Sequence, residues 1–86
     1  MEKAIVTVKD RSGQFERDME LPVGLPVSVL AKKLLEALKI IDQRTFSPYG
    51  SLSLFCGGKA LDKTKTLNEL EIWDGSIIVV QQEAGI

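Results

Sequence analysis

The part of the sequence that decides the fold is residues 54–80, LFCGGKALDKTKTLNELEIWDGSIIVV. Its first three residues complete an alternating apolar pattern over residues 52–56, and this pattern predicts a β-strand. The Gly57-Gly58 pair that follows favours a tight turn, because glycine tolerates positive φ. Residues 59–61 are then expected to form a very short returning strand.

The second half of this stretch predicts one helical turn and one strand. Thr66 and Glu69 have capping-box spacing, in which the hydroxyl and the carboxylate each accept a bond from the other residue's backbone N–H. Asp74-Gly75 predicts another turn. The following strand, residues 76–81, is apolar on both faces, which is typical of a strand at the centre of a sheet.

Upstream of this stretch, the sequence predicts a β-hairpin. Residues 3–10 alternate between faces and are rich in β-branched side chains. The turn signal Asp10-Arg11-Ser12-Gly13 leads to a returning strand over residues 15–21. Arg17 falls on the same face as Met19, so the alternation is imperfect, and a β-bulge near the hairpin would restore it.

A single helix is predicted between the hairpin and residues 52–56. Pro22 ends the returning strand, and Pro26 suits the first turn of a helix, which we expect over residues 27–40. One stripe of this helix is apolar at helical spacing: Val27, Leu30, Ala31, Leu34, Ala37, Leu38 and Ile41. Residues 47–50 are expected to form a loop.

The predicted order of elements indicates an α+β fold with one mixed sheet of four to five strands. A hairpin, a crossover helix and further strands require the helix to pack across one face of the sheet. The first and last strands of the chain are expected to lie side by side and parallel at the centre. We expect one domain over residues 1–81, followed by a flexible tail over residues 82–86.

Composition excludes several kinds of enzyme and cofactor site. The 86 residues include no histidine and a single cysteine, Cys56. The chain therefore has no His-based catalytic group or metal ligand, and no internal disulfide or Cys-x-x-Cys site. We interpret Cys56 as a small apolar residue at a strand end. The sequence thus predicts a protein that is not an enzyme and that needs neither metal nor cofactor.

Charge and hydropathy indicate a soluble protein whose partner is another protein. The net charge is −1, from 11 Lys and Arg against 12 Asp and Glu, whereas nucleic-acid binding usually needs a basic face. The longest unbroken aliphatic run, Ile77 to Val80, is far too short for a membrane span. No signal peptide pattern follows the first residues. We expect a cytoplasmic location, with no direct membrane insertion.

Residues 54–80 resemble ubiquitin in register and without a gap, which implies the ubiquitin-like β-grasp fold. The shared positions are Gly58-Lys59, Leu61, Thr66-Leu67, Ile72, Ser76 and Val80. The resemblance implies that Leu54, Leu61, Leu67 and Ile72 face the helix. It also implies positive φ at Gly57 and Gly75.

The end of the sequence departs from ubiquitin. Conjugation uses a terminal Gly-Gly, whereas here Gly85 stands alone and Ile86 follows it. If Ile86 is the true terminus, covalent conjugation and sulfur transfer are not expected. Two alternatives stay open: a carrier or modifier whose native C-terminus differs, and a ubiquitin-like domain cut from a larger protein.

A narrower resemblance involves residues 19–30, MELPVGLPVSVL. This segment is similar to the strand-to-helix segment of the bacterial YukD/EsaB proteins, in which Leu-Pro ends the second strand and Pro-Val opens the helix. Those small ubiquitin-like proteins accompany type VII (WXG100, ESX) secretion systems. The resemblance implies an accessory or regulatory component that docks noncovalently on the membrane secretion machinery.

The predicted docking surface is the sheet face opposite the helix. If Leu54, Ile77 and Val79 point to the helix, alternation sends Phe55, Ile78 and Val80 to that face. Clustered outward apolar residues often mark a partner site, and the matching surface of ubiquitin is its main docking patch. Alternatively, the tail or residues 46–49 fold back over this face.

Two further residues are assigned to the predicted interaction surface. Lys59 matches a chain-linkage lysine of ubiquitin, but without a conjugation tail we interpret it as a solvated turn lysine. Trp73 either anchors a contact or packs over its own turn.

Outside this surface, Leu25, Val29 and Ile40 lie off the apolar helix stripe and would form a second apolar spot if they met. Charge is uneven along the chain, with acidic residues after Leu67 and basic residues in the helix region. This asymmetry could steer a partner or pair copies of the chain as a homo-oligomer.

Overall fold

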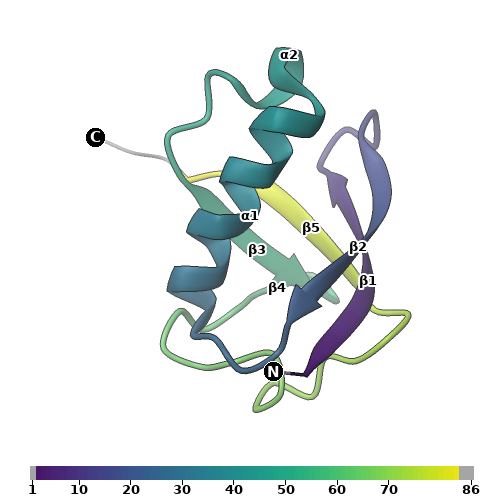
Figure 1. The fold of residues 1–86 in the computed structure, drawn as a ribbon, viewed down its shortest axis with the longest axis vertical. Helices are drawn as coiled ribbons and strands as arrows, with labels where there is room; N and C mark the ends of the chain where they lie inside the picture. The colour runs from purple at the N-terminus through teal and green to yellow at the C-terminus, as the bar shows by residue number, and fades with distance from the viewer. Residues whose placement is uncertain (1, 84–86) are drawn as a thin grey trace.

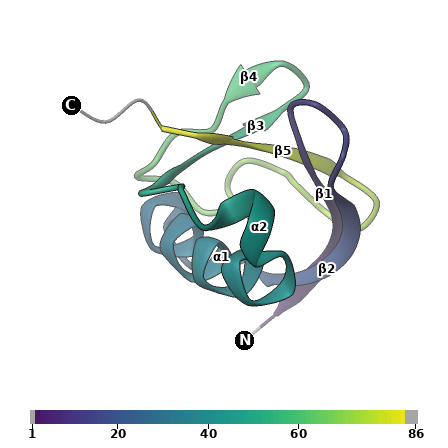
Figure 2. The same ribbon diagram turned by 90° about the horizontal axis from the view of Figure 1, so that it is seen from above.

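A computed structural model of the chain describes residues 2–83 and contains one five-stranded sheet with a helix across one face (Figure 1). Viewed from above, both helices lie on the same side of the sheet (Figure 2). The elements in chain order are β1 Lys3–Asp10, β2 Glu16–Pro22, α1 Val27–Ile41, α2 Gln43–Phe46, β3 Leu52–Cys56, β4 Lys59–Ala60 and β5 Ile77–Gln82. The α+β architecture expected from the sequence is confirmed.

The two ends of the chain meet at the centre of the sheet, as predicted. The strand order is β2-β1-β5-β3-β4, and β1 pairs with β5 in parallel, with Val8 opposite Ile78. All other pairs are antiparallel. This placement explains why β5 has no polar face, since it has a strand on each side.

The first hairpin contains no bulge, so a bulge does not account for the imperfect alternation at Arg17. The β1–β2 register runs without interruption from Lys3 opposite Pro22 to Lys9 opposite Glu16. Arg17 lies opposite the buried Val8 and is nevertheless exposed. The edge position of β2 removes the need for a bulge, because a long side chain there reaches solvent from the core-facing side.

Backbone carbonyls of a distant loop satisfy the first N–H groups of α1. Pro26 precedes the helix and provides no side-chain cap. Instead, the N–H of Val27 donates to the carbonyl of Lys65 at 2.8 Å, and the N–H of Ser28 donates to that of Lys63 at 3.1 Å. These bonds fasten the start of α1 to the segment that follows β4.

The chain forms a second short helix that the sequence reading missed. α1 ends at Ile41, one residue beyond the predicted boundary, and α2 follows at once. Asp42 caps α2, because its carboxylate accepts bonds from the N–H and the hydroxyl of Thr45 at 3.2 and 2.8 Å. The Asp at the start of this turn was the available signal.

Phe46, at the end of α2, closes one end of the core. It is fully buried, and its ring centroid lies 5.1 Å from those of Phe15 and Tyr49 in edge-on contacts. Residues 46–49 therefore belong to the helix layer (Figure 2). The alternative that this segment folds over the opposite sheet face was wrong.

The core lies between α1 and the sheet. Leu54, Leu67 and Ile72 are buried as expected, whereas Leu61 is half-buried against the core. The helix stripe is shifted slightly from the predicted one, since Leu35 joins the core and Ile41 remains 37% exposed. Leu35 is included because the side of a helix that faces a sheet buries a band of side chains wider than a single row.

The turns behave as the sequence predicts. Thr66 and Glu69 exchange their capping-box bonds, at 3.0 Å to the carboxylate and 3.1 Å to the hydroxyl. Gly57 and Gly75 have φ of 61° and 88°. At the C-terminal side, β5 includes Gln82, and the N–H of Glu83 donates to the carbonyl of Ser51 at 2.9 Å. The flexible tail was predicted over residues 82–86, so its first two residues are these paired positions, and residues 84–86 lie outside the described range.

Candidate functional site

The two faces of β5 are the reverse of the predicted assignment. Ile78 and Val80 are both 0% exposed, and they point to the helix, so their assignment to the docking surface was wrong. Register explains the reversal, because Val80 lies opposite the buried Leu54 and cross-strand partners share a face. A strand that is apolar on both sides carries no signal that tells which side is the core.

The outward face still carries clustered apolar residues, but β5 contributes Ile77 and Val79. Phe55 of β3 lies directly opposite Val79 of β5, and Ala60 of β4 lies opposite Phe55 on its other side. Ile77 is 50% exposed and Ile5 of β1 is 52% exposed, while Phe55 and Val79 are half-buried. We call this surface the outer patch, and its residues are Ile5, Phe55, Ala60, Ile77 and Val79.

Lys59 and Trp73 lie away from the centre of the outer patch. The register places Lys59 opposite Cys56, whose side chain packs against the core, so Ala60 is the β4 residue that shares the face of Phe55. Trp73 is 50% exposed and lines a shallow hollow together with Ala4 and Val23. This hollow lies beside the start of β1, whereas Phe55 pairs with Val79 of β5.

Polar pairs border the outer patch on β1 and β2. Thr7 donates its hydroxyl proton to Asp18 at 2.8 Å, and the Lys9 ammonium lies 4.0 Å from the Glu16 carboxylate. Beyond Val79, the Arg11 guanidinium donates to the Gln81 side chain at 3.1 Å. The outward face therefore has an apolar part over β5 and β3, extended by Ile5 of β1, and polar and charged pairs over the rest of β1 and β2, the pattern of a core and rim in protein interfaces.

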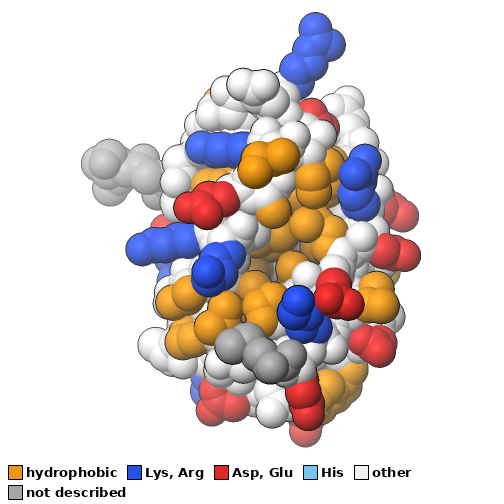
Figure 3. Space-filling model, viewed as in Figure 1, with side chains coloured by type: hydrophobic (Ala, Val, Ile, Leu, Met, Phe, Trp, Pro, Cys, Tyr) orange, Lys and Arg blue, Asp and Glu red, His pale blue; other side chains and the backbone are white. Residues whose placement is uncertain are grey.

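Val29, Ile40 and Leu25 do not meet in a second apolar spot. Val29 and Ile40 are exposed, at 39% and 85%, but a rise of 1.5 Å per residue sets them about 16 Å apart along α1. Leu25 is half-buried. On the helix side of the molecule, Figure 3 shows hydrophobic side chains between α1 and β2 with charged residues around them.

Within residues 2–83, the side chains form no group of three or more His, Cys, Asp or Glu that could hold a metal ion. Over the same range, neither helix has the length and apolar character to span a bilayer.

Comparison with known proteins places this fold in a specific family. A family model described as "WXG100 protein secretion system (Wss), protein YukD" matches residues 4–80. A search of curated proteins found no match.

Solved structures with the same fold include several parts of type VII secretion systems. The ubiquitin-like domain of the Mycobacterium tuberculosis secretion protein EccD1 is 19% identical, with a TM-score of 0.73 over 93% of this chain and 98% of that one. A chain of the ESX-5 inner membrane complex is 22% identical, with a TM-score of 0.79 over 100% of this chain and 22% of that one. Protomer 1 of the ESX-3 core complex is 26% identical, with a TM-score of 0.66 over 99% and 17%. The fold is thus ubiquitin-like.

Proposed function

The chain belongs to the YukD family of the WXG100 protein secretion system, and from this membership we propose that it acts as a docking module that binds a protein of that system noncovalently. The observation that carries the proposal is the outer patch. Its aliphatic and aromatic side chains lie exposed or half-buried on a sheet face that no second layer covers within residues 2–83. The free energy of the system falls when a partner covers such a cluster and removes it from water.

The proposed partner is a protein of the membrane-bound secretion complex. Similar ubiquitin-like folds occur within the ESX-3 core complex and the ESX-5 inner membrane complex, where they make up a small part of longer chains. This supports a cytoplasmic module that adds to, or regulates, a membrane assembly. In this role the protein works by surface complementarity and carries out no chemical step.

Phe55 and Ile77 are the residues expected to contribute most to binding. Phe55 offers an aromatic ring at the middle of the patch, and Ile77 is its most exposed β5 side chain. Aromatic and aliphatic residues at the centre of an interface, surrounded by polar pairs, typically carry most of the affinity. Lys59 and Trp73 are proposed to contribute only at the margins, if the partner extends that far.

A pair of matched variants tests the proposal. We expect Ile77→Asp to weaken binding to the detergent-solubilised secretion complex by about 30-fold or more, since interface hot spots are worth about 2 kcal/mol. Ile40→Asp places the same change at an 85% exposed residue of α1 and should leave binding unchanged. Thermal unfolding should show that both variants remain folded.

Two results would overturn the proposal. Equal binding by both variants would exclude the outer patch as the docking surface. A ladder of heavier covalent conjugates, seen by intact mass spectrometry of the protein from cells, would replace docking with a carrier or modifier function. Phe55→Ala provides a second check, because it should weaken binding and cost little stability.

A further inference from the structure

One edge of the sheet is left open beside α1. β3 has β5 along one side, but on the other side β4 pairs only with Phe55 and Cys56. Beyond that pairing, the N–H of Leu61 donates to the carbonyl of Leu54 at 2.8 Å. The next residues of β3 along this edge have no neighbouring strand within residues 2–83.

The backbone of Leu52 points to this open edge. In an antiparallel pair, alternate residues bond to the neighbouring strand, and the bond from Glu83 to Ser51 fixes which residues of β3 face β5. The backbone N–H and carbonyl groups of Leu52 and Leu54 therefore point away from β5, toward the open edge. Among the described residues, the N–H and the carbonyl of Leu52 and the N–H of Leu54 have no hydrogen-bond partner on that side.

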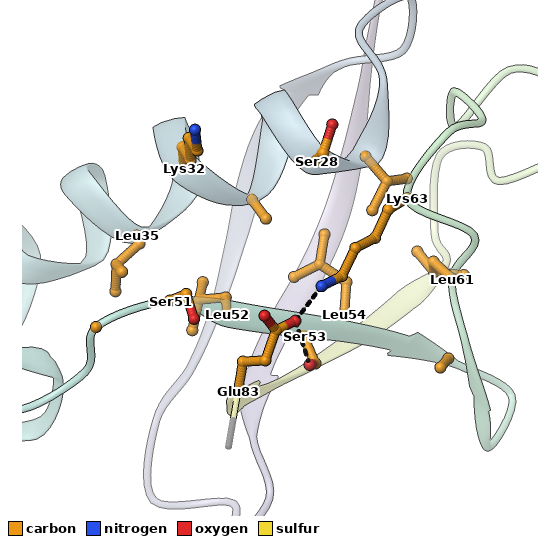
Figure 4. A pocket seen from close by; sticks show the side chains of 14 residues that line it. Ser28, Lys32, Leu35, Ser51, Leu52, Ser53, Leu54, Leu61, Lys63 and Glu83 are labelled. Carbon is orange, nitrogen blue, oxygen red and sulfur yellow. Dashed lines mark hydrogen bonds and ion pairs between the residues drawn. The ribbon is translucent and has the colours of Figure 1, made fainter. Parts of the chain in front are cut away.

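An apolar groove lies next to these unpaired groups. It has a volume of about 230 Å³ and runs between α1 and β3 (Figure 4). Its apolar lining comes from both elements and from the segment after β4: Val27, Ala31, Leu35, Leu52, Leu54 and Leu61. The bonds from Val27 and Ser28 to the carbonyls of Lys65 and Lys63 hold the start of α1 against the segment that follows β4, at one end of the groove.

The charged residues at the groove are arranged across the open edge. Lys63, which follows β4, pairs with Glu83, which follows β5, so the ion pair crosses β3 (Figure 4). The Ser53 hydroxyl also donates to Glu83 at 3.2 Å. Charged side chains over an edge strand are a usual protection against unwanted pairing. Lys32, on the α1 side, has no acidic partner among the described residues.

We propose that the groove between α1 and β3 receives an extended acidic segment of a protein partner, which adds to the sheet along β3. Main-chain groups of the segment bond to Leu52 and Leu54, and alternate apolar side chains enter the groove. A carboxylate of the segment meets Lys32, and the Lys63–Glu83 pair opens to admit the new strand. This site lies at the sheet edge and does not depend on the outer patch.

The experiment uses the ¹⁵N-labelled full chain and a synthetic probe. The probe is a capped peptide of about six residues, the usual length of a strand, that alternates Val with Thr and ends in Asp. Its matched control has N-methyl groups on alternate residues, which removes the main-chain donors. We expect saturable shift changes at the amides of Leu52 and Leu54 with the probe, and none with the control.

Two lysines that are neighbours on α1 provide matched variants. Lys32→Glu should weaken probe binding about five-fold, the equivalent of about 1 kcal/mol for a surface charge pair. Lys33 does not line the groove, and Lys33→Glu should change binding by less than about two-fold. Glu83→Gln should tighten binding, because Lys63 no longer bridges the edge.

Several outcomes would overturn the inference. These are equal binding of the N-methylated peptide, shift changes confined to the outer patch, and no saturation at millimolar probe. A dimer of this protein in which the Leu52 amide is protected from hydrogen exchange would assign the groove to a second copy of the chain. Probe binding only after removal of residues 84–86 would assign it to the protein's own C-terminal segment. Phe55→Ala should leave probe binding intact, so failure here and failure of the outer patch are distinguishable.

Discussion

Asp10 shows how one residue organises the first hairpin. It is the only buried charged residue among those described, at 6% exposed. Its carboxylate accepts bonds from the N–H of Phe15 at 3.1 Å and from the hydroxyl of Ser12 at 2.8 Å. Burial alone would raise the pKa of Asp10, but the bonds from Phe15, Ser12 and the intervening turn outweigh burial and lower it. The ionised carboxylate therefore stabilises the turn.

This predicts a pH-dependent effect of Asp10→Asn. Because the folded-state pKa lies below the unfolded value of about 3.9, the charge stabilises the fold fully above that value, and this contribution is lost as pH falls through the folded pKa. At neutral pH we expect the variant to lose about 1–3 kcal/mol in the free energy of unfolding. Urea denaturation at pH 7 and near pH 2 should show the gap narrowing in acid, and an unchanged gap would contradict this account.

Among the elements, β5 most clearly separates what the sequence can predict from what it cannot. The position, parallel pairing with β1 and central location of β5 follow from its apolar run and from the order of the other elements. Its orientation does not, because Ile77 to Val80 offer equally apolar faces. The face is fixed by register with Leu54, a long-range contact absent from any local pattern. The sequence therefore predicts an apolar cluster on the sheet face opposite the helix, but it assigns the wrong β5 residues to that face.

Truncation of two neighbouring β5 side chains compares how much each face of the strand contributes to the free energy of unfolding. Ile78→Ala should lower the free energy of unfolding by about 2–5 kcal/mol, because it opens a cavity in the core. Ile77→Ala, the same chemical change at a 50% exposed side chain, should cost about 0.5 kcal/mol or less. Chemical denaturation of both variants gives the comparison. The reverse order of costs would return Ile78 to the outward surface.

At the scale of the whole molecule, β5 joins two halves that otherwise share no sheet pairing. The β1–β2 hairpin and the β3–β4 hairpin each pair internally, and β5 is the only described strand that pairs with both. The sequence predicted this arrangement from the order of elements. It missed α2, since a single capped turn is too short to show helical periodicity.

Removal of the last strand should therefore abolish the fold. A chain that ends at Gly75 keeps α1 and both hairpins but loses the strand that connects them, and we expect it to be unfolded. A chain that ends at Glu83 retains every buried core residue described and should fold. Dispersion of amide proton shifts distinguishes the two states. A dispersed spectrum from the shorter chain would contradict the central role of β5.

The central pairing of β1 with β5 also has a consequence during synthesis. Ribosomes add about 5–20 residues per second, so the first strand waits several seconds for its last neighbour, while small mixed domains fold far faster once complete. The nascent chain cannot assemble the outer patch before β5 has been made, because Ile5, Phe55 and Ile77 lie in strands that are far apart in the sequence. A partner that recognises the patch therefore selects molecules in which β5 has joined the sheet.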